Sequence, residues 1–312
     1  MHRFILLSTT LTSLMSVSAC VTSPIEKPAY KSETLVFSSA SRGQEKSVVA
    51  MIATPFGPKD KLPLIITQHG SNRDGVIFPG GVGRTDEYSS RLMREGTKRG
   101  FAVAALDAFY KTSLNPQDKG KFPNAHNYAL DLKEILAKDQ RFDPNNFFYT
   151  GFSYGAGQVN KSVDIRTDFK FLPWRAVAAA EPGCNIIPEP AKVPFPVLMI
   201  KGSESHYHIE PCQYFARLLK SAGVSIELTI IEGANHFFST DGRIVEGKAV
   251  NGCRFNPVIR KKDRFEFADG TPATRASIRQ KCFTNTGGAG KNRLLLDGVI
   301  ERVLRYFDRH KT

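Results

Sequence analysis

Three features that would decide the class of this protein are absent or scarce in its 312 residues. No internal repeat or low-complexity tract is present, which excludes a repeat array. The uncharged run at 4–17 is too short to cross a membrane as a helix, which needs about 20 apolar residues. Acidic residues are few, because 30 Asp and Glu face 43 Lys and Arg and leave a formal net charge of +13.

The deficit of acidic residues raises the question of a polyanionic partner. Residues 260–264 form a local basic cluster, and such clusters occur in proteins that bind nucleic acid. No nucleic-acid-binding motif is present, so we predict no nucleic-acid partner. Attraction to anionic envelope surfaces or acidic polymers, and simple solubility, are the two explanations of the charge that stay open.

The amino terminus has the layout of a secretory signal. A short basic start with Arg3 precedes the uncharged run, and small residues close it before Cys20. We therefore predict a signal peptide at 1–19, and lipidation of Cys20 as in bacterial lipoproteins rather than a plain signal peptide. A tether at 20–32 would follow the lipid anchor, which is the expected membrane contact. By analogy with Gram-negative lipoproteins, Val21 in place of an aspartate favours the outer membrane of the cell envelope.

Cysteine is scarce, and the four cysteines after Cys20 show no zinc-ligand spacing, so we predict no metal site. An even set in an oxidising compartment predicts two disulfides, for which three pairings exist. Cys184 and Cys212 follow the ends of successive predicted strands, which are neighbours in a parallel sheet, while Cys253 and Cys282 bracket an insertion. We expect the pairs Cys184–Cys212 and Cys253–Cys282, each contributing about 3–4 kcal/mol in the chain-entropy treatment.

The most specific motif present is Gly151-Phe152-Ser153-Tyr154-Gly155. It lies between a strand-like run at 146–150 and a helix-like run at 156–160. Strand, G-x-S-x-G and helix together are typical of the nucleophile elbow of the α/β-hydrolases, whose tight turn requires small residues two before and two after the serine. The motif therefore predicts Ser153 as a nucleophile.

An earlier buried strand, at 62–68, ends in His69-Gly70-Ser71, where these enzymes place an oxyanion donor. We predict the backbone N–H groups of Tyr154 and Ser71 as the two donors, and an ordinary strand-ending turn is the alternative for His69-Gly70. The base is predicted to be His236, because it alone follows a last-strand pattern, at 225–231. His126, His206 and His208 are its rivals.

The acid is less clearly indicated. The strand at 194–201 is followed by Gly202-Ser203-Glu204-Ser205, whereas the usual pattern Gly-x-x-Asp would place the carboxylate at position 205. Glu204 lies one residue early and is our favoured acid. Glu181, which ends the preceding strand at 175–180, is the alternative, and one carboxylate is needed to orient the imidazole.

The segment at about 61–308 resembles the dienelactone hydrolase family, in its serine-nucleophile, secreted branch. The resemblance covers roughly four fifths of the chain with the hydrolase motifs in the family's order. It departs from the family at Ser153, where the name-giving enzyme has cysteine, and at Ser205. The matching pieces are Gln68-His69-Gly70, Leu106-Asp107-Ala108-Phe109, Gly151-Phe152-Ser153-Tyr154-Gly155, Pro182-Gly183-Cys184, Glu210-Pro211-Cys212 and Gly233-Ala234-Asn235-His236-Phe237.

Alternating strand and helix patterns predict one α/β-hydrolase domain at 33–312, with a mostly parallel twisted sheet and helices on both faces. The stretch at 239–291 is predicted to be an insertion closed by the second disulfide, with a short strand near 265–268. It could border the active-site mouth or a partner surface, but we favour the reading in which the disulfide merely keeps the insertion folded. Strands are expected near 33–38, 47–54, 63–68, 101–106, 147–151, 175–180, 196–201 and 225–231, and helices near 84–99, 123–139, 154–164, 209–222 and 293–309.

These patterns together predict an exported serine hydrolase that cleaves a small-molecule carboxylic ester through an acyl-enzyme on Ser153 and needs no cofactor. An acyltransferase or a peptidase using the same triad is one alternative. A non-catalytic envelope binding protein on the hydrolase scaffold is another. No sequence feature indicates the oligomeric state.

Overall fold

The computed structural model describes residues 30–41, 43–57, 60–167, 173–236, 238, 244–288 and 290–312. The predicted signal peptide, Cys20 and most of the predicted tether lie outside these residues. Within the described ranges, none of the helices combines the length and the apolar character that a membrane span requires.

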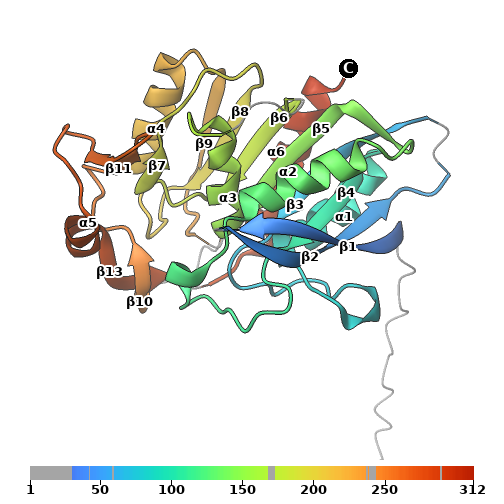
Figure 1. The fold of residues 1–312 in the computed structure, drawn as a ribbon, viewed down its shortest axis with the longest axis horizontal. Coiled ribbons are helices and arrows are strands. Elements are labelled where there is room, and N and C mark those ends of the chain that lie inside the picture. Colours follow the sequence, from blue (N-terminus) through green and yellow to red (C-terminus); the bar gives the residue numbers. More distant parts are fainter. Residues whose placement is uncertain are drawn as a thin grey trace, which may run out of the picture.

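A central sheet organises the molecule (Figure 1). Its eight strands are β1 (Lys31–Ser41), β2 (Gln44–Thr54), β3 (Leu62–Gln68), β4 (Ala102–Asp107), β5 (Phe142–Phe152), β6 (Ala176–Ala180), β8 (Val197–Gly202) and β9 (Ile226–Ile231). Their spatial order is β1-β2-β4-β3-β5-β6-β8-β9. The β1–β2 and β2–β4 pairs are antiparallel and the other neighbours are parallel. The predicted antiparallel start and parallel remainder are therefore confirmed.

Helices cover both faces of this sheet. One apolar layer includes α1 (Glu87–Lys98) and α6 (Arg293–His310), and the other includes α2 (Ala125–Leu136), α3 (Tyr154–Val159) and α4 (Glu210–Ser221). Because successive side chains of a strand point to opposite faces, Val49 of β2 joins the α1 and α6 layer while Val48 and Ala50 join the other. Burial on both faces explains why β3 and β4 read as nearly continuous apolar runs.

Three short 3-10 helices complete the main body: η1 (Pro79–Gly81), η2 (Lys119–Lys121) and η3 (Asn160–Val163). The last of these continues α3, which accounts for the longer helix that the sequence predicts at 154–164. All five expected helices are present.

The insertion forms a separate small body beside the carboxyl edge of the sheet, at the left of Figure 1. Its strands β10 (Ile244–Val250) and β13 (Phe283–Gly288) pair with each other. A second small sheet joins β12 (Phe265–Phe267), β11 (Val258–Arg260) and β7 (Ile186–Pro188), the last of which belongs to the main body. The expected strand near 265–268 is confirmed as β12, while β10, β11, β13 and the helix α5 (Arg275–Cys282) were not predicted.

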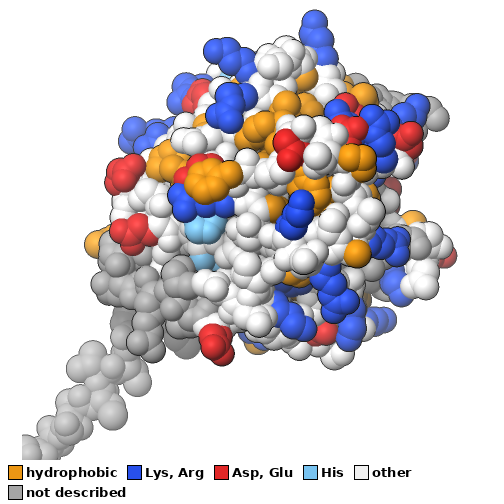
Figure 2. All heavy atoms as spheres, turned by 90° about the vertical axis from the view of Figure 1, so that its left-hand side faces the viewer, with side chains coloured by type: hydrophobic (Ala, Val, Ile, Leu, Met, Phe, Trp, Pro, Cys, Tyr) orange, Lys and Arg blue, Asp and Glu red, His pale blue; other side chains and the backbone are white. Residues whose placement is uncertain are grey.

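Both predicted disulfides are present. Cys184 pairs with Cys212, and Cys253 pairs with Cys282. The first bond ties the loop after β6 to α4, and the second lies in the core of the insertion. The insertion is also strongly basic, with ten Lys and Arg against four Asp and Glu at positions 244–291. Figure 2 shows the same excess of basic side chains on the face of the molecule that carries the insertion.

Candidate active site

The predicted nucleophile elbow has the geometry that its sequence requires. Ser153 joins β5 to α3 with φ 52° and ψ −108°, a strained conformation for a residue with a side chain. A Cβ atom at Gly151 would lie 2.6 Å from the carbonyl carbon of Gly155, and one at Gly155 would lie 2.2 Å from the carbonyl oxygen of Gln68. The two glycines therefore let β5, α3 and the end of β3 come together around the serine.

Two further predicted residues, which follow β9 and β6, extend from the serine in a chain of contacts. His236 follows β9, and its Nε2 lies 2.8 Å from Ser153 Oγ. On the other side of the ring, His236 Nδ1 lies 3.4 Å from Oε1 of Glu181, which follows β6. Because a carboxylate only accepts hydrogen bonds, Nδ1 carries the proton, and Nε2 accepts the hydrogen bond of the Ser153 hydroxyl. Ser153, His236 and Glu181 thus form a serine–histidine–acid chain.

The preference for Glu204 as the acid needs correction. Its side chain is exposed, and only its backbone N–H is held, by the carbonyl of Ala234 at 2.9 Å. The alternative, Glu181, is fully buried and lies against the imidazole. Glu204 points away because the turn after β8 is tight: a Cβ at Gly202 would lie 2.2 Å from the Ala234 carbonyl oxygen, and Ser205, not Glu204, faces inward.

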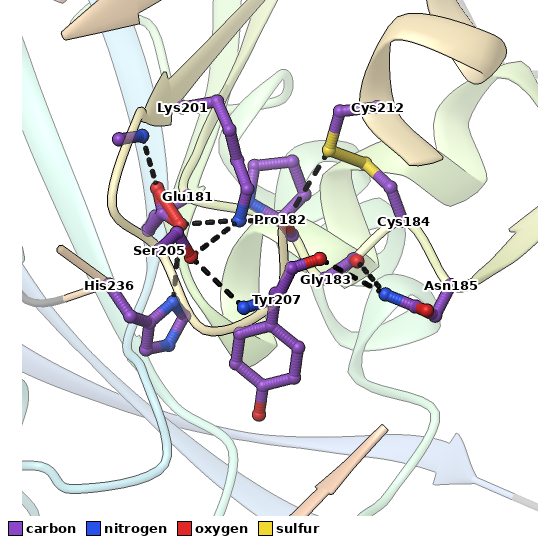
Figure 3. The surroundings of a disulfide bond; sticks show 11 residues. Glu181, Pro182, Gly183, Cys184, Asn185, Lys201, Ser205, Tyr207, Cys212 and His236 are labelled. Atoms are coloured by element: carbon purple, nitrogen blue, oxygen red, sulfur yellow. Dashed lines mark hydrogen bonds and ion pairs between the residues drawn. A yellow bond between two sulfur atoms is a disulfide. The ribbon is translucent and has the colours of Figure 1, made fainter. Parts of the chain in front are cut away.

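Glu181 is held by the end of β8 (Figure 3). Its Oε2 accepts a hydrogen bond of 2.8 Å from the backbone N–H of Gly202, and its Oε1 accepts one from the ammonium group of Lys201. Burial raises the pKa of Glu181, but the Lys201 ammonium and the His236 ring outweigh burial and hold that pKa well below its usual range. Burial lowers the pKa of His236, and the contact with Glu181 offsets part of this effect. The arrangement therefore combines an ionised acid with a neutral base.

The predicted oxyanion turn is fixed by side chains behind it. His69 Nδ1 donates to the carbonyl oxygen of Gly70 at 2.7 Å, while its Nε2 accepts from the backbone N–H of Ala108 at 2.9 Å. The Gly70 N–H in turn donates to Asp86 Oδ2 at 2.5 Å. Since the C=O and N–H of one planar peptide point in opposite directions, the N–H of Ser71 points away from His69. Ser71 and Tyr154 both line the same cavity as Ser153, as the oxyanion prediction requires.

This cavity has a volume of about 430 Å³. Aromatic side chains from the main body form part of its wall, namely Phe122, Phe152, Tyr154 and Tyr207. Basic groups also line it, including Lys119 and Arg293 from the main body and Lys291 from the end of the insertion. The insertion contributes a further part of the wall through Glu246, Gly247, Lys248, Gly287 and Gly288. The favoured reading, in which the disulfide merely keeps the insertion folded, is therefore incomplete, because the insertion borders the cavity of the candidate active site.

Two side chains beside the triad were not predicted to contribute to the site. His206, treated only as a rival base, packs its ring 4.9 Å from the His236 ring and lines the cavity. In the sequence, Lys201 is the last residue of an apolar strand pattern. In the structure it is completely buried and contacts Glu181. Its signal was a lysine in an otherwise apolar run, one residue before Gly202. The rivals His126 and His208 do not line this cavity among the described residues.

Within the described part of the chain, no group of three His, Cys, Asp or Glu side chains is arranged to hold a metal ion. The serine, the histidine and the buried carboxylate lie in the order that acyl transfer by an activated serine requires.

No protein-family model matches this chain, and no curated protein matches it. Solved structures do. A dienelactone hydrolase-like promiscuous phosphotriesterase from metagenomic libraries superimposes with a TM-score of 0.55 at 10% identity, covering 89% of this chain and 98% of that one. A candidate dienelactone hydrolase from Klebsiella pneumoniae gives a TM-score of 0.50 at 16% identity over 68% and 90% of the two chains. The chain therefore has the α/β-hydrolase fold that its sequence predicts.

Proposed function

We propose that this protein is an exported serine hydrolase that cleaves carboxylic esters, with Ser153 as nucleophile, His236 as base and Glu181 as acid. The observation that carries the proposal is the continuous chain from Ser153 Oγ to His236 Nε2, at 2.8 Å, and from His236 Nδ1 to Glu181, at 3.4 Å. A serine on a strained elbow, with its hydroxyl directed at a neutral imidazole, is the arrangement that activates this weak nucleophile.

The geometry supports a two-stage reaction. Ser153 Oγ attacks the ester carbonyl carbon while its proton passes to His236 Nε2, and the backbone N–H groups of Tyr154 and Ser71 hold the resulting oxyanion. Collapse of the tetrahedral intermediate breaks the bond to the alcohol, which leaves with the proton from Nε2. Water then attacks the acyl-enzyme by the same route and restores Ser153. Glu181 stabilises the imidazolium that forms in each stage.

The substrate class follows from the cavity and from the resemblance to the dienelactone hydrolase family. A cavity of about 430 Å³ with an aromatic wall suits a small-molecule ester with an apolar part. The solved structures with a similar fold include a dienelactone hydrolase-like enzyme, which supports this class. Export as a lipoprotein anchored through Cys20 in the outer membrane is part of the proposal, and the two disulfides are consistent with an oxidising compartment.

The deciding experiment is labelling of the purified protein with a fluorophosphonate, read by intact mass. We expect one adduct on the wild-type protein and none on Ser153→Ala. We also expect ester hydrolysis by the wild-type protein that this substitution abolishes. A wild-type protein that takes up no adduct would overturn the proposal and favour the non-catalytic binding scaffold.

Export is tested separately. In a Gram-negative host, metabolic labelling with a fatty acid is expected to tag the full chain and to fail on Cys20→Ala. A wild-type chain that carries no lipid would contradict the proposed lipidation of Cys20 and would leave the proposed reaction at Ser153 unaffected.

A further inference from the structure

Lys201 is an unusual residue to find in the interior of this protein. It lies in β8 with no exposed surface and is among the largest fully buried side chains in the described part of the chain. A lysine ammonium has three N–H donors. Here they meet three oxygens: Glu181 Oε1, the Pro182 carbonyl at 3.1 Å and Ser205 Oγ at 2.9 Å.

The same carboxylate oxygen joins this lysine to the candidate triad (Figure 3). Glu181 Oε1 accepts from Lys201 Nζ and also lies 3.4 Å from His236 Nδ1. The other oxygen, Oε2, is occupied by the Gly202 N–H. Glu181 is thus fully buried, and the groups that stabilise its negative charge are those of Lys201, Gly202 and His236. A buried carboxylate without a counter-charge takes up a proton, because burial penalises the ionised form by several kcal/mol.

We propose that Lys201 is a positioning residue of the candidate triad, whose ammonium keeps Glu181 ionised and aimed at His236 while leaving His236 neutral between turnovers. The inference rests on the proposed function. With Lys201 present, the buried pair Lys201–Glu181 is neutral as a whole, so the acid does not need a proton on His236 to balance it. Without Lys201, an imidazolium at His236 becomes the nearest counter-charge of Glu181.

The remaining charged and titratable groups around His236 do not replace Lys201. Lys119, from η2, is a second cation that acts on His236, and its Nζ lies 3.0 Å from the Tyr207 hydroxyl. The rings of His206 and Tyr207 lie 4.9 Å and 4.7 Å from the His236 ring. Burial lowers the pKa of His206 to about 2 and raises that of Tyr207 to about 12, so both are neutral near pH 7. Glu181 is therefore the acidic group that decides the protonation of His236.

The test is a titration of His236 by NMR in protein labelled with ¹⁵N-histidine, with His236→Gln used to assign the signal. Lys201→Met is expected to raise the proton affinity of the Glu181–His236 pair by about tenfold or more, since an opposite charge at this range shifts a pKa by about 1–3 units. Lys201→Arg keeps the charge and is expected to titrate close to the wild-type protein. If Lys201→Met does not fold, Lys201→Gln removes the charge but keeps an amide donor for Glu181.

A matched control is Lys133→Met, because Lys133 is also buried but lies over the Trp174 ring, 4.6 Å from its centroid. It should leave the His236 titration unchanged. The same midpoint in wild type, Lys201→Met and Lys201→Gln would overturn the proposal and reduce Lys201 to a packing residue. Because the titration needs no substrate, a protein without ester hydrolysis would contradict the proposed function and still allow the role of Lys201 to be judged.

Discussion

The carboxyl edge of the main sheet and the insertion both border the same cavity, yet they are stabilised in different ways. At the sheet edge, Ser153 and Glu181 directly follow β5 and β6. β6 is completely buried and β5 is buried from Asn146 to Gly151, so the register of these two strands sets the positions of both residues. The insertion has a core of six buried residues, and two of these are the cysteines of its disulfide. A core so small depends on a covalent cross-link more than a large one does.

This difference suits two tasks: the sheet edge positions the groups expected to react, and the insertion shapes the cavity. The triad needs positions fixed to a fraction of an ångström, which a buried parallel sheet provides. The wall of the cavity needs only a surface of suitable form, which a small cross-linked unit supplies. We therefore expect changes at the sheet edge to lower kcat, and changes in the insertion to raise KM or to loosen the unit.

The largest effect is expected for Glu181→Gln. An amide there no longer stabilises the imidazolium of His236, and comparable changes in serine hydrolase triads lower kcat by about 10³–10⁴-fold. The measurement is kcat for an activated ester, together with the rate of fluorophosphonate labelling. KM should change little, because Glu181 has no exposed surface and does not face the cavity.

Glu204→Gln is the matched control for this prediction. Glu204 is exposed and makes no side-chain contact with His236, so its loss should leave kcat within about twofold of the wild-type value. The reverse pattern, with Glu204→Gln inactive and Glu181→Gln active, would return the acid to the position first favoured from the sequence.

The case of the acid shows what the sequence could and could not provide. The elbow and His236 were predictable because each follows a strand in a fixed local pattern, as were the strands themselves, whose apolar runs are long. The choice between Glu204 and Glu181 depended on which side chain the turn at Gly202 directs inward, and this follows from the close approach of Ala234, a residue 32 positions away. The strands of the insertion were hard to predict for the same reason, because they are short and pair with strands that lie far away in the sequence.

The second effect concerns the two disulfides, whose cysteines are 28 and 29 residues apart. Replacing Cys253 and Cys282 by alanine should destabilise the insertion by about 3–4 kcal/mol, because both bonds close loops of similar length in the chain-entropy treatment. We expect limited proteolysis to cut within 244–288 while Ser153 still takes up the fluorophosphonate. KM should rise with kcat largely kept.

The corresponding double alanine variant of Cys184 and Cys212 provides the contrast. Cys184 lies three residues after Glu181, so this bond braces the loop that carries the acid. Here kcat should fall as well. Equal kinetic behaviour of the two double variants would contradict the division between sheet edge and insertion.

A third, smaller effect is expected where the insertion touches the site. A Cβ at Gly288 would lie 2.5 Å from Nδ1 of His206, whose ring packs against His236. Gly288→Ala should therefore displace His206 or β13 at a cost of about 1–3 kcal/mol, seen as a lower Tm and a raised KM. Gly298→Ala is the control, because a Cβ there meets nothing within 4 Å and alanine favours a helix such as α6. A Gly288→Ala protein as stable as the wild type would show that the insertion does not pack on His206.

The smallest expected effect is a shift in the pH dependence of kcat/KM. His236 must be neutral to accept the proton of Ser153, and burial lowers its pKa. The base therefore stays active below the ordinary histidine value of about 6.5, and the acid limb of kcat/KM should have its midpoint under that value. Opening the insertion by removing Cys253 and Cys282 admits water to the shared cavity, which should move the midpoint upward. If the midpoint stays in place when the insertion is open, the main body alone buries His236, and the insertion shapes the cavity without tuning the base.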